Sequence, residues 1–149
     1  MKTCVFFGHR DMSCQKYKEQ LKQILTDLIK YEGFTQFYSG GRGAFDNLCA
    51  ETVAELKKSY PQIKNTLVFS YLPLSNADFS LSPIYTDTLY ALERRVPPRY
   101  AVLETNKAMV DKADCLVVGI TREWGGAWQA VEYAKRKKKR IINVCEENA

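Results

Sequence analysis

The chain has 149 residues, which is the size of one domain, so no second domain is needed. Its hydrophobic fraction of 46% and charged fraction of 26% exclude a disordered chain or a fibrous repeat. A net charge of +5 favours anionic partners, but six of the 22 basic residues form one run at 135–140. This run stands at the end of a predicted helix, where cations offset the helix dipole, and we favour this role over a nucleic-acid patch.

Targeting and metal signals are absent from the sequence. The first strand-like run holds only four apolar residues before Gly8, and nothing approaches the ~20 apolar residues that cross a bilayer. We therefore expect a cytoplasmic protein with no membrane partner. The five cysteines are widely spaced without a CxxC pair and are predicted to be reduced, buried hydrophobes. The single histidine cannot form a metal site with a second one, so no metal is expected, and we expect no cofactor.

Hydrophobic periodicity predicts strands and helices that alternate along the whole chain. The predicted elements are a strand at 2–7, a helix from about 13 to 32, a strand at 34–38, a helix starting near 45, a strand at 66–72, a helix at 99–112, a strand at 115–120, a helix at 127–138 and a strand at 140–145. Apolar strands joined by helices are typical of a parallel sheet covered on both faces. The predicted fold class is therefore α/β, a Rossmann-like three-layer sandwich with a mainly parallel sheet, in a single domain at 1–149.

One long irregular segment interrupts this pattern. It contains four of the five prolines, Pro73, Pro83, Pro97 and Pro98, and a short strand or turn within 84–92. A loop of this length in a compact domain is usually functional, so we expect it to form a lid or a wall of a ligand site.

Three segments should meet at the carboxyl edge of the predicted sheet, where ligands of such folds bind. Two are glycine-rich turns, and glycine there tolerates positive φ and leaves backbone N–H groups open to a phosphate. The candidate ligand-binding residues of the first segment are Gly8, His9 and Arg10. Those of the two glycine-rich turns are Ser39, Gly40, Gly41, Arg42, Gly43 and Asp46 in one, and Glu123, Trp124, Gly125 and Gly126 in the other.

The side chains in these segments allow more than one role. Arg10 could pair with a phosphate, and His9 could donate to a phosphate or cap a backbone group. Asp46 could bind ribose hydroxyls, act as an acid or base, or simply favour the helix dipole. Trp124 and Trp128 could stack on a base, although an aromatic residue on a helix face is more often part of the core.

The ordered motifs resemble those of the SLOG superfamily, the Rossmann-like group that includes the DNA-processing protein DprA and the cytokinin-activating LOG enzymes, and most of all its small Firmicutes members related to YpsA. The resemblance rests on the segments 4–10, 40–46, 96–101 and 124–127, on Asn106 with 109–111, and on 132–134. It implies binding of nucleotides or their derivatives, adds Asn106 to the candidate site, and makes a homodimer an expectation.

The same resemblance bears on catalysis. LOG enzymes split nucleoside 5'-monophosphates with a glutamate and an arginine, and the matching positions here hold Ala130 and Thr105. The leading hypothesis is therefore a nucleotide-binding module, such as a sensor, with no assigned catalytic residue. Two alternatives remain: a hydrolase of an N-glycosidic bond that uses Asp46, Glu51 or Glu123, and a DprA-like binder of single-stranded DNA favoured by the charge.

Overall fold

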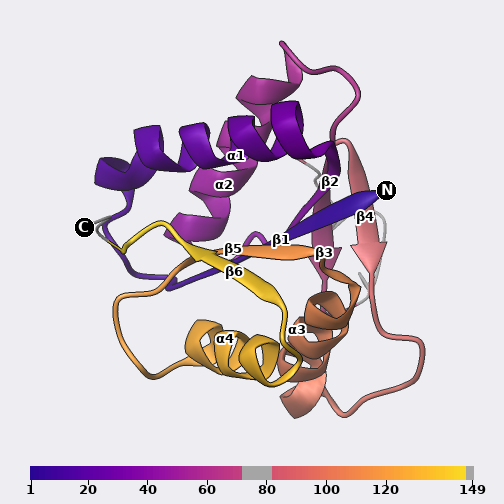
Figure 1. The fold of residues 1–149 in the computed structure, drawn as a ribbon. Coiled ribbons are helices and arrows are strands. Elements are labelled where there is room, and N and C mark those ends of the chain that lie inside the picture. Colours follow the sequence, from indigo (N-terminus) through magenta and orange to yellow (C-terminus); the bar gives the residue numbers. More distant parts are fainter. Residues whose placement is uncertain (72–81, 147–149) are drawn as a thin grey trace.

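The computed structural model describes residues 1–71 and 82–146 and contains one six-stranded sheet in the order β4-β3-β2-β1-β5-β6 (Figure 1). The strands are β1 (Lys2–Gly8), β2 (Phe34–Ser39), β3 (Lys64–Phe69), β4 (Asp87–Tyr90), β5 (Cys115–Gly119) and β6 (Arg140–Asn143). All five strand pairings are parallel. The predicted α/β fold with a parallel sheet is confirmed.

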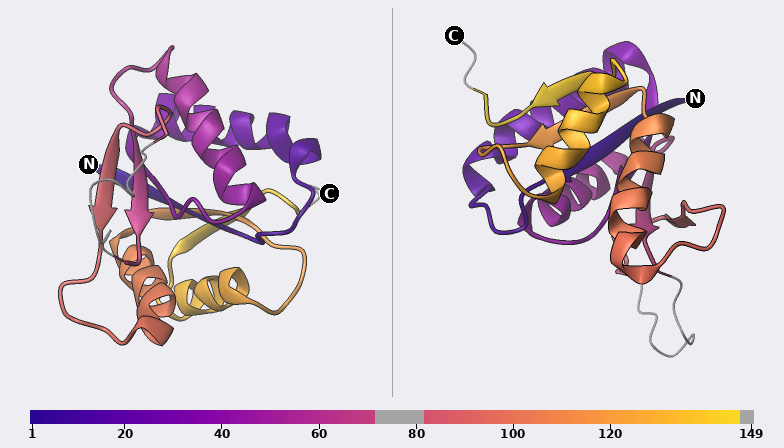
Figure 2. Two further views of the ribbon diagram at one scale, coloured as in Figure 1. Left: turned by 180° about the vertical axis from the view of Figure 1, so that it is seen from behind. Right: turned by 90° about the horizontal axis from the view of Figure 1, so that it is seen from below.

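Helices cover both faces of the sheet, which gives three layers (Figures 1 and 2). Helices α1 (Lys18–Glu32) and α2 (Ala44–Lys57) lie on one face, and α3 (Ala101–Lys112) and α4 (Gly126–Arg136) lie on the other. None of the helices within 1–71 and 82–146 is long and apolar enough to span a membrane.

Element boundaries differ from the predictions by a few residues. The helix predicted from about 13 begins at Lys18, because the short 3-10 helix η1 (Gln15–Tyr17) comes first. A second 3-10 turn, η3 (Pro98–Tyr100), precedes α3 because proline is tolerated only in a first helical turn. The end of the strand predicted at 66–72 and the part of the proline-rich segment at 73–81 lie outside the described residues.

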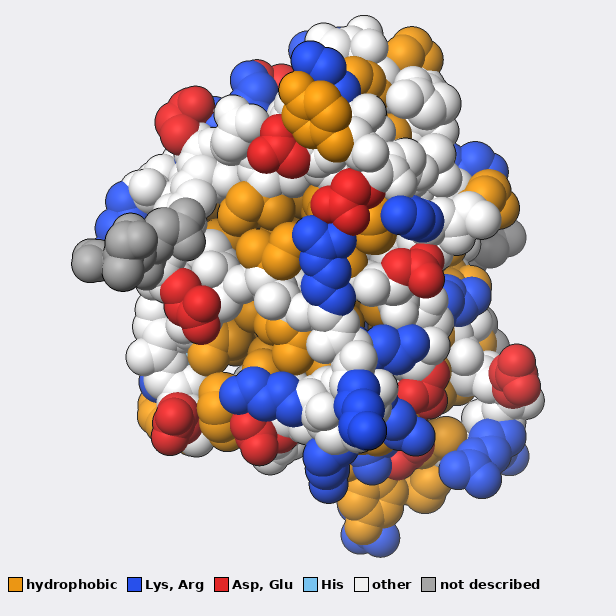
Figure 3. Space-filling model, viewed as in Figure 1, with side chains coloured by type: hydrophobic (Ala, Val, Ile, Leu, Met, Phe, Trp, Pro, Cys, Tyr) orange, Lys and Arg blue, Asp and Glu red, His pale blue; other side chains and the backbone are white. Residues whose placement is uncertain are grey.

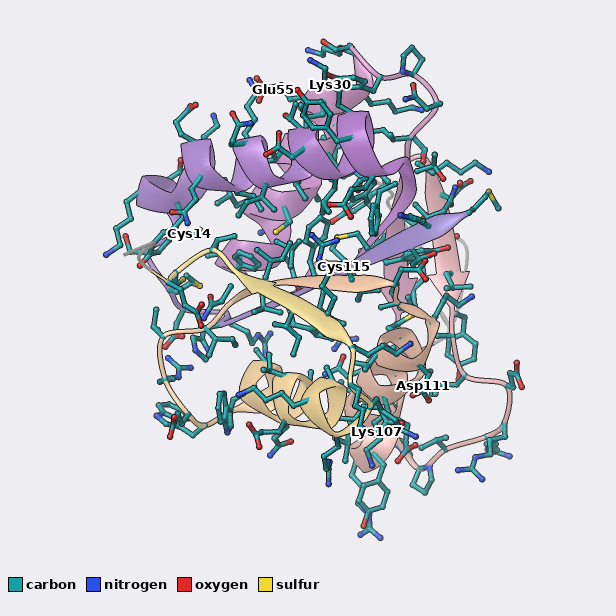
Figure 4. The ribbon with its side chains drawn as sticks, in the orientation of Figure 1. Cys14, Lys30, Glu55, Lys107, Asp111 and Cys115 are labelled. Atoms are coloured by element: carbon teal, nitrogen blue, oxygen red, sulfur yellow. The ribbon has the colours of Figure 1, made fainter. Side chains whose placement is uncertain are left out.

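The sheet separates two apolar cores. Phe6 on β1 and Phe37 on β2 face α1 and α2, whereas Val5 faces α3 and α4. Alternate residues of one strand therefore enter opposite cores, which is why the strands read as continuous apolar runs. All five cysteines are free, and Cys145 alone among them is not fully buried. Figure 4 shows Cys115 on β5 and Cys14 in the segment between β1 and α1.

The order of the strands creates a crevice at one edge of the sheet. The chain moves outward from β1 through β2, β3 and β4, and then returns to β5 on the other side of β1. The loop after β1 therefore leads to α1 on one face, and the loop after β5 leads to α4 on the opposite face. Ligands of open α/β sheets bind where the strand order reverses in this way.

Two glycines end the strands at this crevice. Gly8 of β1 and Gly119 of β5 are paired in the sheet, and the fully buried ring of Phe45 lies against both. A Cβ added at Gly8 would lie 2.2 Å from Phe45, and one at Gly119 would lie 2.7 Å from it. Both glycines are therefore required by the packing of α2 onto the sheet.

We expect Gly8→Ala to lower the free energy of unfolding by about 1–3 kcal/mol, because the new methyl group overlaps the Phe45 ring. Denaturant unfolding followed by circular dichroism measures the change. The double variant Gly8→Ala, Phe45→Leu should recover part of the loss. An unchanged stability of Gly8→Ala would show that Phe45 does not fix this contact.

Candidate functional site

A pocket of about 540 Å³ opens at the carboxyl edge of the sheet. It lies among the ends of β1 and β2, helix α3 and the first turn of α4. Eleven of the predicted site residues line it: Gly8, His9, Arg10, Ser39, Gly40, Arg42, Asp46, Asn106, Trp124, Gly125 and Gly126. Gly41, Gly43 and Glu123 are not part of its lining.

The glycine turn before α2 is closed by the protein itself. A Cβ on Gly43 would lie 2.5 Å from Cα of Arg10, and one on Gly41 would lie 2.7 Å from Leu67. The Arg42 N–H already donates to Oδ2 of Asp46 over 3.1 Å. Contacts within the protein therefore account for Gly41 and Gly43, and a carboxylate of the chain occupies part of this turn.

The glycine turn before α4 is open. Gly125 is the N-cap of α4 at φ +99°, and neither it nor Gly126 would bring an added Cβ within 4 Å of another atom. Among the residues that the structure describes, no side chain caps this helix, and its first turn contains no acidic residue. The free N–H groups and the dipole of α4 are thus available to an anion in the pocket. The two turns resemble each other in sequence but not in what they leave exposed.

His9 joins the loop after β1 to the loop after β5. Its Nε2 accepts hydrogen bonds from the N–H groups of Thr121 at 3.1 Å and Arg122 at 3.3 Å. A ring nitrogen that accepts is unprotonated, so the other nitrogen carries the proton of a neutral imidazole. Burial and, secondarily, the charge of Arg122 lower the pKa of His9, while Asp11 opposes the shift. His9 therefore caps backbone groups, which is one of its two predicted roles.

Arg122 and Asp11 are pocket residues that the sequence analysis did not select. Arg122 donates to Asp11 over 3.0 Å, and its guanidinium lies 3.9 Å from the centroid of the Trp124 ring. Trp124 is 64% exposed, so it belongs to the rim of the pocket and not to the core. Arg122 lies inside a segment that was selected for its glycines, and its position next to His9 in the fold could have been found only from the structure.

Two further arginines line the side of the pocket near α2. Arg10 donates from Nε to the carbonyl of Arg42 over 3.0 Å, and the Arg42 guanidinium bonds the hydroxyl of Ser70. Burial lowers the pKa of Arg42. Three arginines therefore line the pocket: Arg10, Arg42 and Arg122.

The basic run at 135–140 lies elsewhere. It begins in the last turns of α4, at the opposite end of that helix from the pocket. Lys139 of the run donates to the carbonyls of Asp111 at 3.1 Å and Ala113 at 2.9 Å, at the end of α3. Lys and Arg side chains gather over α3 and α4 in Figure 3, and Figure 4 places Asp111 on α3. The run was predicted to offset the dipole of the helix that it ends, α4, whereas the side-chain contacts of Lys139 are with carbonyls at the end of α3.

Behind the rim, the pocket continues as an apolar slot between the sheet and α3. Val5, Tyr38 and Val68 supply the wall from the sheet, and Val102 and Met109 supply the wall from α3. These positions read as ordinary core residues in the sequence, so no local signal marks them as a ligand site.

Asp46 is the acidic group of the pocket that has no ion pair among the described residues. Burial raises the pKa of its carboxyl to about 6, against the opposing effects of the Arg42 amide and the Arg42 and Arg10 charges. Within 1–71 and 82–146, no group of His, Cys, Asp and Glu side chains could hold a metal ion.

We expect Asp46→Asn to stabilise the free protein by about 1–3 kcal/mol at pH 7.5. The folded carboxyl holds its proton to a pH near 6, so wild-type stability falls as pH rises from about 4 to 6. Asparagine keeps an acceptor for the Arg42 amide and removes this fall. Denaturant unfolding of both proteins from pH 4 to 8 gives the difference between their free energies of unfolding at each pH. The titration of His9 has the opposite effect on stability, but it is the same in both proteins and cancels in this difference. A difference that does not depend on pH would contradict the raised pKa.

Comparison with known proteins gives a family match and a fold match. Residues 2–78 match the sequence model of the YspA SLOG family (YpsA). DNA processing protein A from Streptococcus pneumoniae aligns with a TM-score of 0.66 at 13% identity, over 95% of this chain and 49% of that protein. The same protein from Helicobacter pylori, whose single-stranded DNA binding mode was studied, aligns with a TM-score of 0.60 at 14% identity, over 94% of this chain and 63% of that one.

The chain thus spans about half to somewhat under two thirds of the lengths of these two proteins. At identities of 13% and 14%, these matches show a shared fold alone. No curated protein sequence matches the chain.

Proposed function

The chain belongs to the YspA SLOG family, and from this premise we propose that it binds a nucleotide or a nucleotide-derived ligand in the carboxyl-edge pocket. One observation carries the proposal: the uncapped N-terminus of α4 opens into the pocket at Gly125 and Gly126. An uncapped helix N-terminus of this kind is suited to a phosphate.

The charged groups near the pocket support an anionic ligand. Arg122 lies within the loop that leads from β5 to α4, and Arg10 and Arg42 line the opposite side. Hydrogen bonds from a guanidinium to a phosphate are among the strong polar contacts in proteins. We assign the phosphate to the α4 turn, because the Arg42 N–H of the α2 turn already donates a hydrogen bond to the carboxyl of Asp46.

The uncharged groups support the rest of a nucleotide. A volume of about 540 Å³ is within the range of small-molecule sites. The apolar slot between the sheet and α3 suits the faces of a base, and the exposed ring of Trp124 offers a further stacking surface at the rim. The carboxyl of Asp46 is suited to accept hydrogen bonds from sugar hydroxyls, which are neutral hydrogen-bond donors.

We expect Gly126→Val to weaken nucleotide binding about 10- to 100-fold, because the side chain takes the place of an anion that accepts charge-assisted hydrogen bonds. Folding should be unaffected, since an added Cβ meets no atom there. Isothermal titration with AMP, ADP-ribose and NAD measures the loss.

The comparison variant is Gly41→Val, which should lose stability because Gly41 has φ +65° and faces Leu67. Equal affinity of wild type and Gly126→Val for the nucleotides would contradict the assignment of the phosphate to the α4 turn. A flat titration of wild type with every nucleotide would contradict nucleotide binding itself.

We expect no more than background release of adenine from AMP. Ala130 is buried and carries no functional group, and Thr105 cannot replace an arginine. Loss of a positioned acid–base or electrostatic group typically costs ~10²–10⁴-fold in rate. Chromatography after a long incubation at high protein concentration measures the released base. Efficient turnover that Asp46→Asn abolishes would favour the hydrolase, whose best candidate acid is the Asp46 carboxyl with its pKa near 6.

A second candidate function is binding of single-stranded DNA, and the arrangement of exposed side chains at the same edge favours it. Tyr71 follows β3, and its hydroxyl donates to the Pro98 carbonyl over 2.9 Å. The exposed Tyr100 precedes α3 and has Arg99 stacked at 4.8 Å. Aromatic and arginine side chains together bind unstacked bases and phosphates.

Fluorescence anisotropy with oligonucleotides distinguishes the two candidates. A polymer binder gains affinity with length up to its site size and loses it steeply with salt. A mononucleotide binder shows the same affinity for AMP with or without competing oligonucleotide.

A further inference from the structure

Thr105 has a buried hydroxyl without a hydrogen-bond partner. The residue is 2% exposed, and its Oγ1 has no hydrogen-bond partner among the described residues. The other two helical threonines of the domain differ from it. Thr26 donates to the Lys22 carbonyl and Thr52 to the Leu48 carbonyl, each over 2.7 Å and four residues back along the helix.

An unpartnered hydroxyl in this position is costly, because it has left water without gaining a protein partner. Threonine in a helix ordinarily avoids this cost by bonding the carbonyl one turn earlier. Valine would fill the same space without any cost, so packing alone does not account for a hydroxyl at 105.

The position of Thr105 indicates which molecule could supply a hydrogen-bond partner for its hydroxyl. Thr105 lines the apolar slot of the pocket together with Val102 and Met109 of the same helix face. A threonine side chain in a helix has two accessible χ1 rotamers, so its hydroxyl can turn toward a bound molecule without movement of the backbone.

We infer that the Thr105 hydroxyl hydrogen-bonds the edge of the ligand's heterocyclic base and helps to determine which base is bound. The inference rests on the proposed nucleotide site and adds the placement of the base within it. A base has flat apolar faces that suit the slot walls and a polar edge that needs a partner. The arginines come from the loops after β1, β2 and β5, where they suit the phosphate, whereas a neutral hydroxyl between apolar side chains suits a neutral group.

The test uses Thr105→Val, which keeps the shape of the side chain and removes the hydroxyl. Thr105→Ser restores a hydroxyl without the methyl group. Thr52→Val is the matched control, since Thr52 is also a buried helical threonine but lies outside the pocket lining. Each full-length protein is titrated calorimetrically with AMP, GMP, CMP and UMP, and its melting temperature is measured without ligand.

We expect Thr105→Val to raise the melting temperature of the free protein by about 2–4 °C, because an orphaned hydroxyl is removed. The same variant should bind the preferred nucleotide about 2- to 10-fold more weakly and should distinguish less between the four bases. Thr105→Ser should keep the base preference. Thr52→Val should bind as wild type does and should gain no stability.

Three results would overturn the inference. A fall in the melting temperature of Thr105→Val would show that the hydroxyl has a partner in the free protein. Unchanged affinity and base preference in Thr105→Val, with wild type binding nucleotides, would remove Thr105 from the site and leave the proposed function intact. Wild type that binds none of the four nucleotides nor ADP-ribose and NAD would overturn both.

Discussion

The ring of Phe45 lies across the last residues of β1 and β5, and the geometry of the whole carboxyl edge depends on that contact. It is possible only because Gly8 and Gly119 are adjacent in the sheet and have no side chains. The contact fixes the start of α2 over the end of β1. The loop after β1 must then pass close to Gly43, where Ala44 donates to the Arg10 carbonyl over 3.0 Å. One apolar packing contact therefore positions the polar groups of the pocket.

Most of the fold could be predicted from the sequence because its signals are local. The five residues of β5 are all buried, and the helices show apolar stripes at the helical period. Strand β4 had the weakest signal: the sequence predicted only a short strand or turn within 84–92, and the strand lies inside that range. Asp87–Tyr90 has no fully buried residue and lies at the edge of the sheet, so its residues lack the apolar run that marks the other strands. It pairs through its backbone with β3, and backbone pairing has no signature in a single sequence.

The location of the candidate site was also predictable, but its working parts were not. Topology alone brings the three loops together, whichever residues they carry. Which glycine turn is open depends on Leu67 and Arg10, which approach the α2 turn from other parts of the chain. The role of His9 depends on amides more than 100 residues away. Contacts of this range cannot be inferred from spacing along the chain.

Several groups in the pocket are held at an energetic cost in the free protein. Asp46 keeps a carboxyl in surroundings that favour its protonated form, and Thr105 keeps a hydroxyl that has no hydrogen-bond partner within 1–71 and 82–146. Gly126 leaves the first turn of α4 bare, although an alanine would fit and would favour the helix. Each of these choices lowers the stability of the empty domain, and each is removed by a conservative substitution.

A ligand that supplies hydroxyls to Asp46, a polar edge to Thr105 and an anion to α4 would recover these costs on binding. The domain should then be markedly more stable when occupied than when empty, because a ligand that binds only the folded state adds its binding free energy to folding. A difference in stability between the two states is a physical basis on which the proposed binding site could report the presence of its ligand.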